Sequence, residues 1–371
     1  MTAGFSKRAL AAKALGSAVA RPFPRARSRE LRILAYHRVL DDDPGSFQYD
    51  EGVISATTEV FERQVQFVAK NFDVISFKDL VQFELGTLPI PKWPLIITFD
   101  DGYRDNYTNA FPVMRRHALP ATIFLAAEYI GKDRLFWWDL VAYCVKHSAA
   151  TSVVLPDVST VPVSLATAED KRLVIGNILQ WIKRVPDKAK NKLVDELPDL
   201  LHVTLPDLSK EPLQLTWDEV REMAAGGIEF GSHTMTHPIL SNVGTDALEH
   251  EIAGSKRLIE QELGKEIVAF AYPVGGQRHF NCEAQVAVAQ SGFRYAVSYI
   301  NGVASMDDCL RTEAADTGNG RSDLLPGNRF SMPRIHVEAA DPLSLFRANL
   351  NFPKIMLDRQ PASDSDLQQL S

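Results

Sequence analysis

The chain has 371 residues, of which 45% are hydrophobic, and its formal net charge is −7. This length and composition allow a large buried core, whereas the lack of any run of about 18 apolar residues excludes a transmembrane helix. The three cysteines, Cys144, Cys282 and Cys309, are widely spaced and odd in number. They exclude a disulfide framework or a zinc knuckle, and they fit a reducing compartment or simple core packing.

The charge is unevenly distributed along the chain. Residues 1–32 carry eight Lys or Arg against the single Glu30, so this segment has a charge of +7 and the remainder −14. A basic head on an acidic body favours contact with an anionic membrane surface over nucleic acid, although a solvated leader explains it equally well. Lys13 interrupts the stretch that could form the core of a signal peptide. We therefore expect a cytoplasmic location rather than export, with peripheral membrane association through a basic N-terminal segment of residues 1–30.

The predicted elements begin with a strand over residues 31–37, which ends in Tyr36-His37. A His at the end of an apolar strand is usually packed and hydrogen-bonded, but in a parallel barrel such strand ends converge on the active-site face. Thr58 is expected to cap a helix that runs to about Asn71. A short strand at Val74-Ile75 and a short helix over residues 78–83 follow.

Residues 95–102 read Leu-Ile-Ile-Thr-Phe-Asp-Asp-Gly and are the most informative stretch. The apolar and β-branched residues up to Phe99 predict a buried strand, and Gly102 supplies the backbone freedom for a tight turn. Asp100 and Asp101 therefore lie side by side at the end of a buried strand. Two such carboxylates are costly unless a cation lies between them or one holds a proton. A divalent metal meets this demand, and a surface Asp-Asp-Gly turn is the alternative.

The following region predicts an α/β fold with an insertion. A helix over residues 103–117 and a strand over 121–125 continue a strand–helix–strand order, which favours a parallel sheet or barrel. The alternation of strands and helices stops at residues 133–214. We predict a mainly helical insertion there, with helices near 168–184 and 187–201. Within it, Trp137-Trp138 offer aromatic faces on which a ligand could stack, but we favour their use as anchors of the insertion to the core.

A pair of histidines strengthens the metal hypothesis. Thr216-Trp217-Asp218-Glu219 is a capping box that opens a helix ending at Gly226-Gly227, and a short strand at residues 228–230 follows. His233 and His237 come next, at a spacing of four that brings both imidazoles to one side if the segment is helical. Two His and one Asp form a common ligand set for catalytic Zn²⁺. A surface turn is the alternative for the His pair considered alone.

The remaining elements are a helix over 245–263 that stops at Gly264 and a strand over 267–271. Tyr272-Pro273-Val274 follows that strand, and Arg334 and His336 follow another strand-like segment near the end of the chain. The polar residues from 356 to 371 predict a disordered tail.

Two of these motifs resemble a known family. Thr98-Phe99-Asp100-Asp101-Gly102 and His233-Thr234-Met235-Thr236-His237 are similar to the first two motifs of the polysaccharide deacetylases, carbohydrate esterase family 4 with the NodB-homology domain. The resemblance covers residues 31 to 340 and implies a distorted (β/α) barrel of about seven parallel strands, here within residues 31–355. It also implies metal-dependent removal of N-acetyl groups from amino sugars. By the resemblance, Asp100 is the catalytic base, and Asp101, His233 and His237 bind the metal, for which we expect Zn²⁺.

The other site residues depart from the usual family pattern. The family's arginine that orders the base is replaced by Ala271, and we expect Arg334 to take its role, a surface arginine being the alternative. Val274 stands near the family's aromatic position, where its backbone N–H can still face the oxyanion, beside Tyr272. The branch with an N-terminal Tyr-His motif implies that His37 is the general acid, with His336 as a rival.

The expected function is hydrolysis of the N-acetyl amide on amino sugars of a polysaccharide, oligosaccharide or sugar-lipid intermediate. Two alternatives remain at this stage: a metal-dependent hydrolase of a small non-sugar amide, and a non-catalytic carbohydrate-binding barrel. The presence of Asp100, Asp101, His233 and His237 together argues against the last of these, because a decayed site would be expected to lose one of them.

Overall fold

The computed structural model describes residues 30–42, 46–155, 157–310 and 329–357. Seven parallel strands form a closed barrel, because the first strand pairs with both the second and the last. Around the barrel they follow chain order: β1 (Glu30–Tyr36), β5 (Pro94–Phe99), β6 (Thr122–Leu125), β9 (Glu229–Ser232), β10 (Ala269–Ala271), β11 (Tyr295–Asn301) and β13 (Met332–His336). The predicted (β/α) barrel of about seven parallel strands is therefore confirmed.

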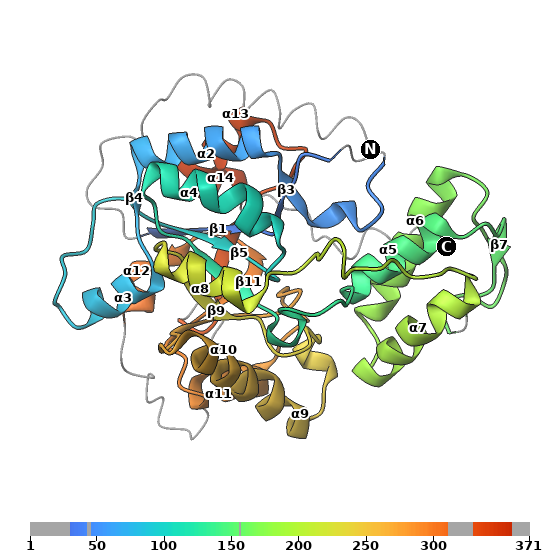
Figure 1. Ribbon diagram of the computed structural model, residues 1–371. Coiled ribbons are helices and arrows are strands. Elements are labelled where there is room, and N and C mark those ends of the chain that lie inside the picture. The colour runs from blue at the N-terminus through green and yellow to red at the C-terminus, as the bar shows by residue number, and fades with distance from the viewer. Residues whose placement is uncertain (1–29, 43–45, 156, 311–328, 358–371) are drawn as a thin grey trace.

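Helices cover the outside of the barrel, with α2 and α4 on one side of the strands and α10 and α11 on the opposite side (Figure 1). Two short strands extend the sheet: β4 (Asp73–Val74) pairs with β5, and β12 (Ala304–Ser305) pairs antiparallel with β1. The helices of the barrel are α2 (Thr58–Asn71), α3 (Phe77–Glu84), α4 (Phe111–His117), α8 (Trp217–Ala225), α9 (Thr245–Glu249), α10 (Ser255–Leu263), α11 (Cys282–Gln290), α12 (Met306–Cys309), α13 (Leu343–Asn351) and α14 (Pro353–Leu357).

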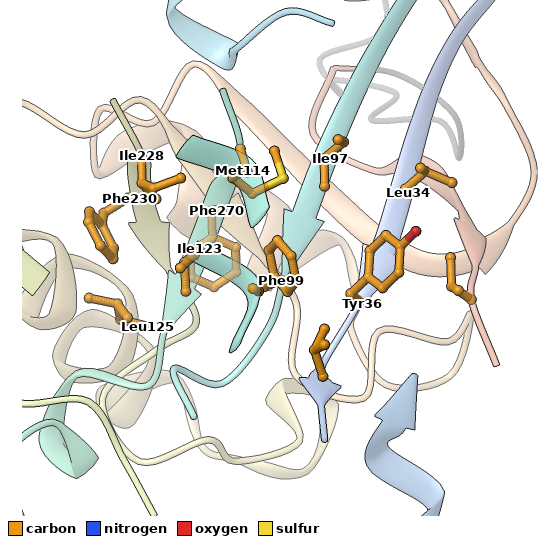
Figure 2. Close-up of a cluster of buried hydrophobic side chains, with 14 of the residues drawn as sticks. Leu34, Tyr36, Ile97, Phe99, Met114, Ile123, Leu125, Ile228, Phe230 and Phe270 are labelled. Atoms are coloured by element: carbon orange, nitrogen blue, oxygen red, sulfur yellow. The ribbon is translucent and has the colours of Figure 1, made fainter. Parts of the chain in front are cut away.

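Each barrel strand has two buried faces, because alternate residues point to opposite sides of the sheet. Ile97 and Phe99 of β5 pack outward with Met114 of α4, as Figure 2 shows. Ile96 belongs to a second cluster that also contains Ile33 of β1. The polar residues Thr98 and Asp100 continue the Ile96 side, so the period of two directs Asp100 away from the helices and towards the barrel axis.

Between β6 and β9 the chain leaves the barrel and forms a largely helical unit, on the right of Figure 1. It contains α5 (Trp137–His147), a hairpin of β7 (Ser152–Val153) and β8 (Val163–Ser164), α6 (Ala168–Ile182) and α7 (Asp187–Leu200). Its apolar residues form a second core, which also includes Tyr103, Ala126 and Tyr129 from the adjoining loops of the barrel. The helix α5 was not predicted, since the helices expected in the insertion were only those near 168–184 and 187–201.

Several local predictions are wrong. Thr57, not Thr58, caps α2 and accepts a hydrogen bond from the N–H of Val60. The helix predicted over 103–117 begins only at the π-helical turn η2 (Asn106–Ala110), because Tyr103 forms an isolated bridge with Gln214. Arg334 lies within a strand and does not follow one.

The two ends of the chain were predicted as a basic segment and a disordered tail. Residues 1–29 and 358–371 lie outside the described part of the structure, so both predictions fall largely beyond it. The tail was expected to begin at residue 356, but α14 extends to Leu357. No helix in the described residues is long and apolar enough to cross a membrane. The three cysteines carry free thiols, with Cys144 and Cys309 buried and Cys282 exposed.

Candidate active site

The candidate site lies in a cavity of about 360 Å³. The sequence-predicted residues that line it are His37, Asp100, Asp101, His233, His237, Tyr272 and Val274. They come from loops that follow β1, β5, β9 and β10, because parallel strands in a barrel deliver their carboxyl ends to one face. Trp137 and Trp138 of the insertion form another part of the wall.

Asp100 forms a bidentate salt bridge with Arg334. The Nη1 and Nη2 atoms of Arg334 donate to the two carboxylate oxygens of Asp100 at 2.7 and 2.6 Å. Arg334 is fully buried and also donates from Nε to the carbonyl of Ser298. Burial alone would raise the pKa of Asp100, but the neighbouring guanidinium of Arg334 lowers it well below its usual range. The carboxyl is therefore an ionised group with a fixed orientation.

Asp101, His233 and His237 present three donor atoms to one point. The Oδ1 of Asp101 lies 3.5 Å from the Nε2 of His233 and 3.4 Å from the Nε2 of His237, and the two nitrogens are 3.2 Å apart. The other ring nitrogen of His233 hydrogen-bonds the carbonyl of Ala271 at 2.7 Å, which orients that imidazole. Burial lowers the pKa of His233 to about 4, so the ring is neutral, as metal ligation requires.

This donor set fits a divalent metal. A tetrahedral ion with bonds of about 2.0–2.2 Å to nitrogen and oxygen needs ligand atoms about 3.3–3.6 Å apart, which is close to the observed spacings of 3.2, 3.4 and 3.5 Å. Both carboxylate oxygens of Asp101 are buried and have no hydrogen-bond partner in the described structure. An unpaired buried carboxylate is costly, and a cation held between Asp101 and the two imidazoles removes this cost.

The segment from His233 to His237 is a bent loop and not the helical turn that was considered for this spacing. Thr234 and His237 both have a positive φ, at 69° and 56°. Two hydroxyls support the bend, because Ser232 accepts from the N–H of Thr234, and Thr234 accepts from the N–H of His237. The imidazoles still meet, because the bend folds the chain back over four residues.

Backbone strain concentrates at this site. Of the seven non-glycine residues with positive φ in the described chain, four are site residues: Asp101, Thr234, His237 and Val274. Val274, at φ 59°, and Thr234 are the least favourable of these because their side chains are β-branched. Each such residue costs on the order of 1–3 kcal/mol, and such strain is typical of functional sites. Tyr272, the other predicted residue after β10, donates a hydrogen bond from its hydroxyl to the carbonyl of Phe330.

The two candidate acids have different surroundings. The Nε2 of His37 lies 3.9 Å from Asp100 Oδ2, and its ring lines the cavity. His336 does not line the cavity; its ring stacks on Tyr299 with centroids 3.7 Å apart, and its Nε2 lies 3.1 Å from the Tyr299 carbonyl oxygen. Burial lowers the pKa of His336 to about 3, which makes its protonated form scarce near neutral pH.

Aromatic side chains of the insertion hold the second histidine. The ring of Trp138 meets that of His237 edge to face, with centroids 4.5 Å apart. The indole N–H of Trp138 donates to the hydroxyl of Tyr103 at 2.7 Å, and this hydroxyl donates to Asp139 at 2.7 Å. Because the Nδ1 of His237 has no hydrogen-bond partner in the described chain, ring packing takes over the orienting role. Trp137 and Trp138 are almost fully buried, so they serve as anchors in this structure.

Sequence reasoning missed the residues that support the site loops. Glu251 accepts hydrogen bonds from the N–H groups of Met235 and Thr236. Asn106 donates from its side chain to the carbonyl of His37 at 2.8 Å. Each supporting residue lies in a π-helical turn, Asn106 in η2 and Glu251 in η5 (His250–Gly254). Such turns often occur at functional sites, but the sequence carries no pattern that predicts one.

Comparison with known proteins places this geometry in a family. A family model described as polysaccharide deacetylase matches residues 89–160 and 176–296, which is more than half of the chain. The chain is 24% identical over 213 residues to the putative polysaccharide deacetylase YxkH of Bacillus subtilis, covering 57% of this chain and 47% of that protein. It is 34% identical over 120 residues to the poly-beta-1,6-N-acetyl-D-glucosamine N-deacetylase of Staphylococcus epidermidis, covering 29% and 40%. The chain thus spans less than half of either relative.

Solved structures share the fold. The Streptococcus pyogenes deacetylase PplD in complex with acetate superposes with a TM-score of 0.51 at 17% identity, covering 84% of this chain and 93% of that one. IcaB from Ammonifex degensii gives a TM-score of 0.51 at 16% identity and covers 88% and 98%. Because the family model matches more than half of the chain, the chain belongs to the polysaccharide deacetylase family.

Proposed function

We propose that this protein is a metal-dependent hydrolase that removes N-acetyl groups from the amino sugars of a saccharide. The proposal rests on two groups of buried side chains that lie together at one cavity. One is the carboxylate of Asp100, fixed by Arg334, and the other is the three-donor set around Asp101. The N-acetylglucosamine substrate named for the Staphylococcus epidermidis relative supports the choice of sugar.

The reaction divides among the residues of the cavity. Asp101, His233 and His237 would hold the metal, for which we propose Zn²⁺ because two imidazoles and a carboxylate are a common zinc set. When bound, this ion supplies Lewis acidity to the water and to the acetyl carbonyl. Asp100 takes the proton of the attacking water, and its ion pair with Arg334 keeps it ionised and correctly oriented.

The remaining steps concern the oxyanion and the leaving amine. Val274 lines the cavity, and we assign its backbone N–H to the developing oxyanion. His37 protonates the leaving amine, after which acetate departs. His37 lines the cavity, whereas His336 is stacked on Tyr299 and does not, and this difference supports the assignment. It also supports our placing of the chain in the branch with an N-terminal Tyr-His motif.

The test combines metal content with acetate release from N-acetylglucosamine oligomers. We expect wild type to bind one metal per chain and to release acetate, and Asp100→Asn to keep the metal but lose turnover. His233→Ala should lose both, because two donors cannot replace three. His250→Ala is the matched control, since that imidazole lies on the surface with 59% of its side chain exposed.

Each other result favours a different function. Full activity in Asp100→Asn would contradict the assignment of the base. Bound metal without acetate release by wild type would favour a small non-sugar amide as substrate. Absence of metal after supply of Zn²⁺ would leave a carbohydrate-binding barrel as the better interpretation.

A further inference from the structure

The backbone of His37 is held by two side chains that are distant in the sequence. The N–H of His37 donates to the hydroxyl of Ser55 at 3.0 Å, and the carbonyl of His37 accepts from the side-chain amide of Asn106 at 2.8 Å. Ser55 belongs to β3 (Ile54–Ala56), and Asn106 opens the π-helical turn η2. Both peptide planes that flank the Cα of His37 are therefore fixed, and with them its φ and ψ angles.

The next residue along the chain sets the direction in which His37 points. Arg38 is buried, its Nε donates to Asp105 Oδ2 at 2.8 Å, and its guanidinium lies 4.3 Å from the centroid of the Tyr103 ring. The other carboxylate oxygen of Asp105 accepts from the N–H of Val39 at 2.9 Å. Successive side chains of an extended segment point to opposite sides. Because Arg38 is anchored on one side, His37 is directed to the other, where it lines the catalytic cavity.

The imidazole of His37 has little support of its own. Its ring meets that of Tyr299 edge to face, with centroids 5.4 Å apart. Its Nε2 lies 3.9 Å from Asp100 Oδ2, which is beyond hydrogen-bond distance. Among the residues that the structure describes, none makes a hydrogen bond to a ring nitrogen of His37. The position of this ring therefore depends on the backbone that carries it.

The turn η2 also connects the general acid to the base. It follows closely after Asp100-Asp101-Gly102 in the chain, and the N–H of Asp100 donates to the carbonyl of Tyr36 at 2.9 Å. The segments that carry the two groups are thus joined twice, at Tyr36 and at His37. Amide hydrolysis needs the base at the attacking water and the acid at the leaving nitrogen at the same time, and a misplacement of about 1 Å can cost about a hundredfold in rate.

We propose that Asn106 is a positioning residue for the general acid: by fixing the carbonyl of His37, with Ser55 fixing the N–H, it places the imidazole against the leaving nitrogen. The inference rests on the proposed function, because it takes His37 as the acid. In the step concerned the C–N bond breaks, its electron pair stays on nitrogen, and nitrogen takes a proton from His37. Asn106 and Ser55 do not line the catalytic cavity, so they act only through His37.

The dependence of the rate on the leaving group separates this role from a structural one. We compare acetate release from N-acetylglucosamine oligomers, whose amine must be protonated to leave, with hydrolysis of 4-nitrophenyl acetate, whose nitrophenolate leaves without a proton. Asn106→Ala should lose roughly ten- to a hundredfold in kcat on the oligomers and less than about threefold on the ester, with its metal content unchanged. His37→Ala should show the same selective loss, and a larger one.

Asn109→Ala is the matched control. Asn109 lies in the same turn and donates to the carbonyl of Val39 at 2.8 Å, so the variant loses a bond of the same kind and length but keeps both bonds to the backbone of His37. We expect its ratio of oligomer rate to ester rate to equal that of wild type. Ser55→Ala should lower this ratio as Asn106→Ala does, and it provides a second test if Asn106→Ala fails to fold.

A double variant tests whether Asn106 acts through His37 alone. His37→Ala combined with Asn106→Ala should release acetate from the oligomers at the same rate as His37→Ala, because no acid is left to be positioned. This comparison uses the oligomers only and does not depend on the ester. A further loss of rate in the double variant would overturn the proposal, since Asn106 would then contribute independently of the acid.

The other outcomes separate the positioning role from the proposed function. If Asn106→Ala and Ser55→Ala have the same rate ratio as Asn109→Ala while His37→Ala shows the selective loss, the positioning role is overturned and the proposed function stands. Equal loss of both rates in His37→Ala would reject this histidine as the acid. Absence of acetate release by wild type would reject the deacetylase activity. Either of the last two results removes the positioning role as well.

Discussion

The ion pair between Arg334 and Asp100 allows a quantitative test of how the site is built. Arg334→Met removes the guanidinium and keeps much of the side chain's length. Because Arg334 is 0% and Asp100 2% exposed, the carboxylate would remain buried without a partner. Removal of one member of a buried pair costs about 3–5 kcal/mol of stability. Arg334→Met combined with Asp100→Asn leaves no unpaired charge, and we expect it to recover a large part of this loss.

The measurement is urea unfolding of the four proteins of this cycle after removal of metal, so that metal binding does not contribute to the free energy of unfolding. We expect a coupling energy of at least about 1 kcal/mol between the two substitutions. Arg221→Met is the matched control, because Arg221 forms ion pairs with Asp218 and Glu262 while 45% of its side chain is exposed. Such a pair contributes at most about 1 kcal/mol. Additive effects, or an Arg334→Met cost no larger than that of Arg221→Met, would refute the reasoning.

Three further predictions concern the surroundings of the site. Tyr103→Phe removes the hydroxyl that links Trp138 to Asp139. We expect the affinity for the metal to fall about tenfold, as measured by competition with a chelator. Unchanged affinity would show that ring packing alone orients His237. Val274→Gly should keep the rate of acetate release within a few-fold of wild type. It should also raise the free energy of unfolding by up to about 1 kcal/mol, because glycine adopts a positive φ without strain. A large loss of activity would mean that the side chain itself is needed. Burial raises the pKa of Asp139 to about 7, so the folded state holds a proton that the unfolded state releases near pH 4. The stability of wild type relative to Asp139→Asn should therefore fall as pH rises from about 4 to about 7 in urea unfolding, and a constant difference would contradict that pKa.

The sequence by itself indicated a parallel α/β fold and the two central motifs. The strand before Asp100 and the alternation of strands and helices are local patterns, and each names a parallel α/β element without reference to the rest of the chain. Gly102 was expected to free the backbone for a turn, and it has a φ of 88°. The Asp pair and the two His were singled out by residue type and position at strand ends, and the family resemblance assigned Asp101, His233 and His237 to the metal. The structure brings the donor atoms of these three residues within 3.2–3.5 Å of one another.

The tertiary structure decided how these residues are supported. Arg334 and Asp100 are 234 residues apart, and they meet because closure of the barrel sets β1 between β5 and β13 while the period of two turns both side chains inward. Neither closure nor register can be read from one strand. The contact of Trp138 with His237 likewise depends on how the insertion packs against the barrel. Packing of this kind joins segments that share no local pattern, so only the folded chain reveals it.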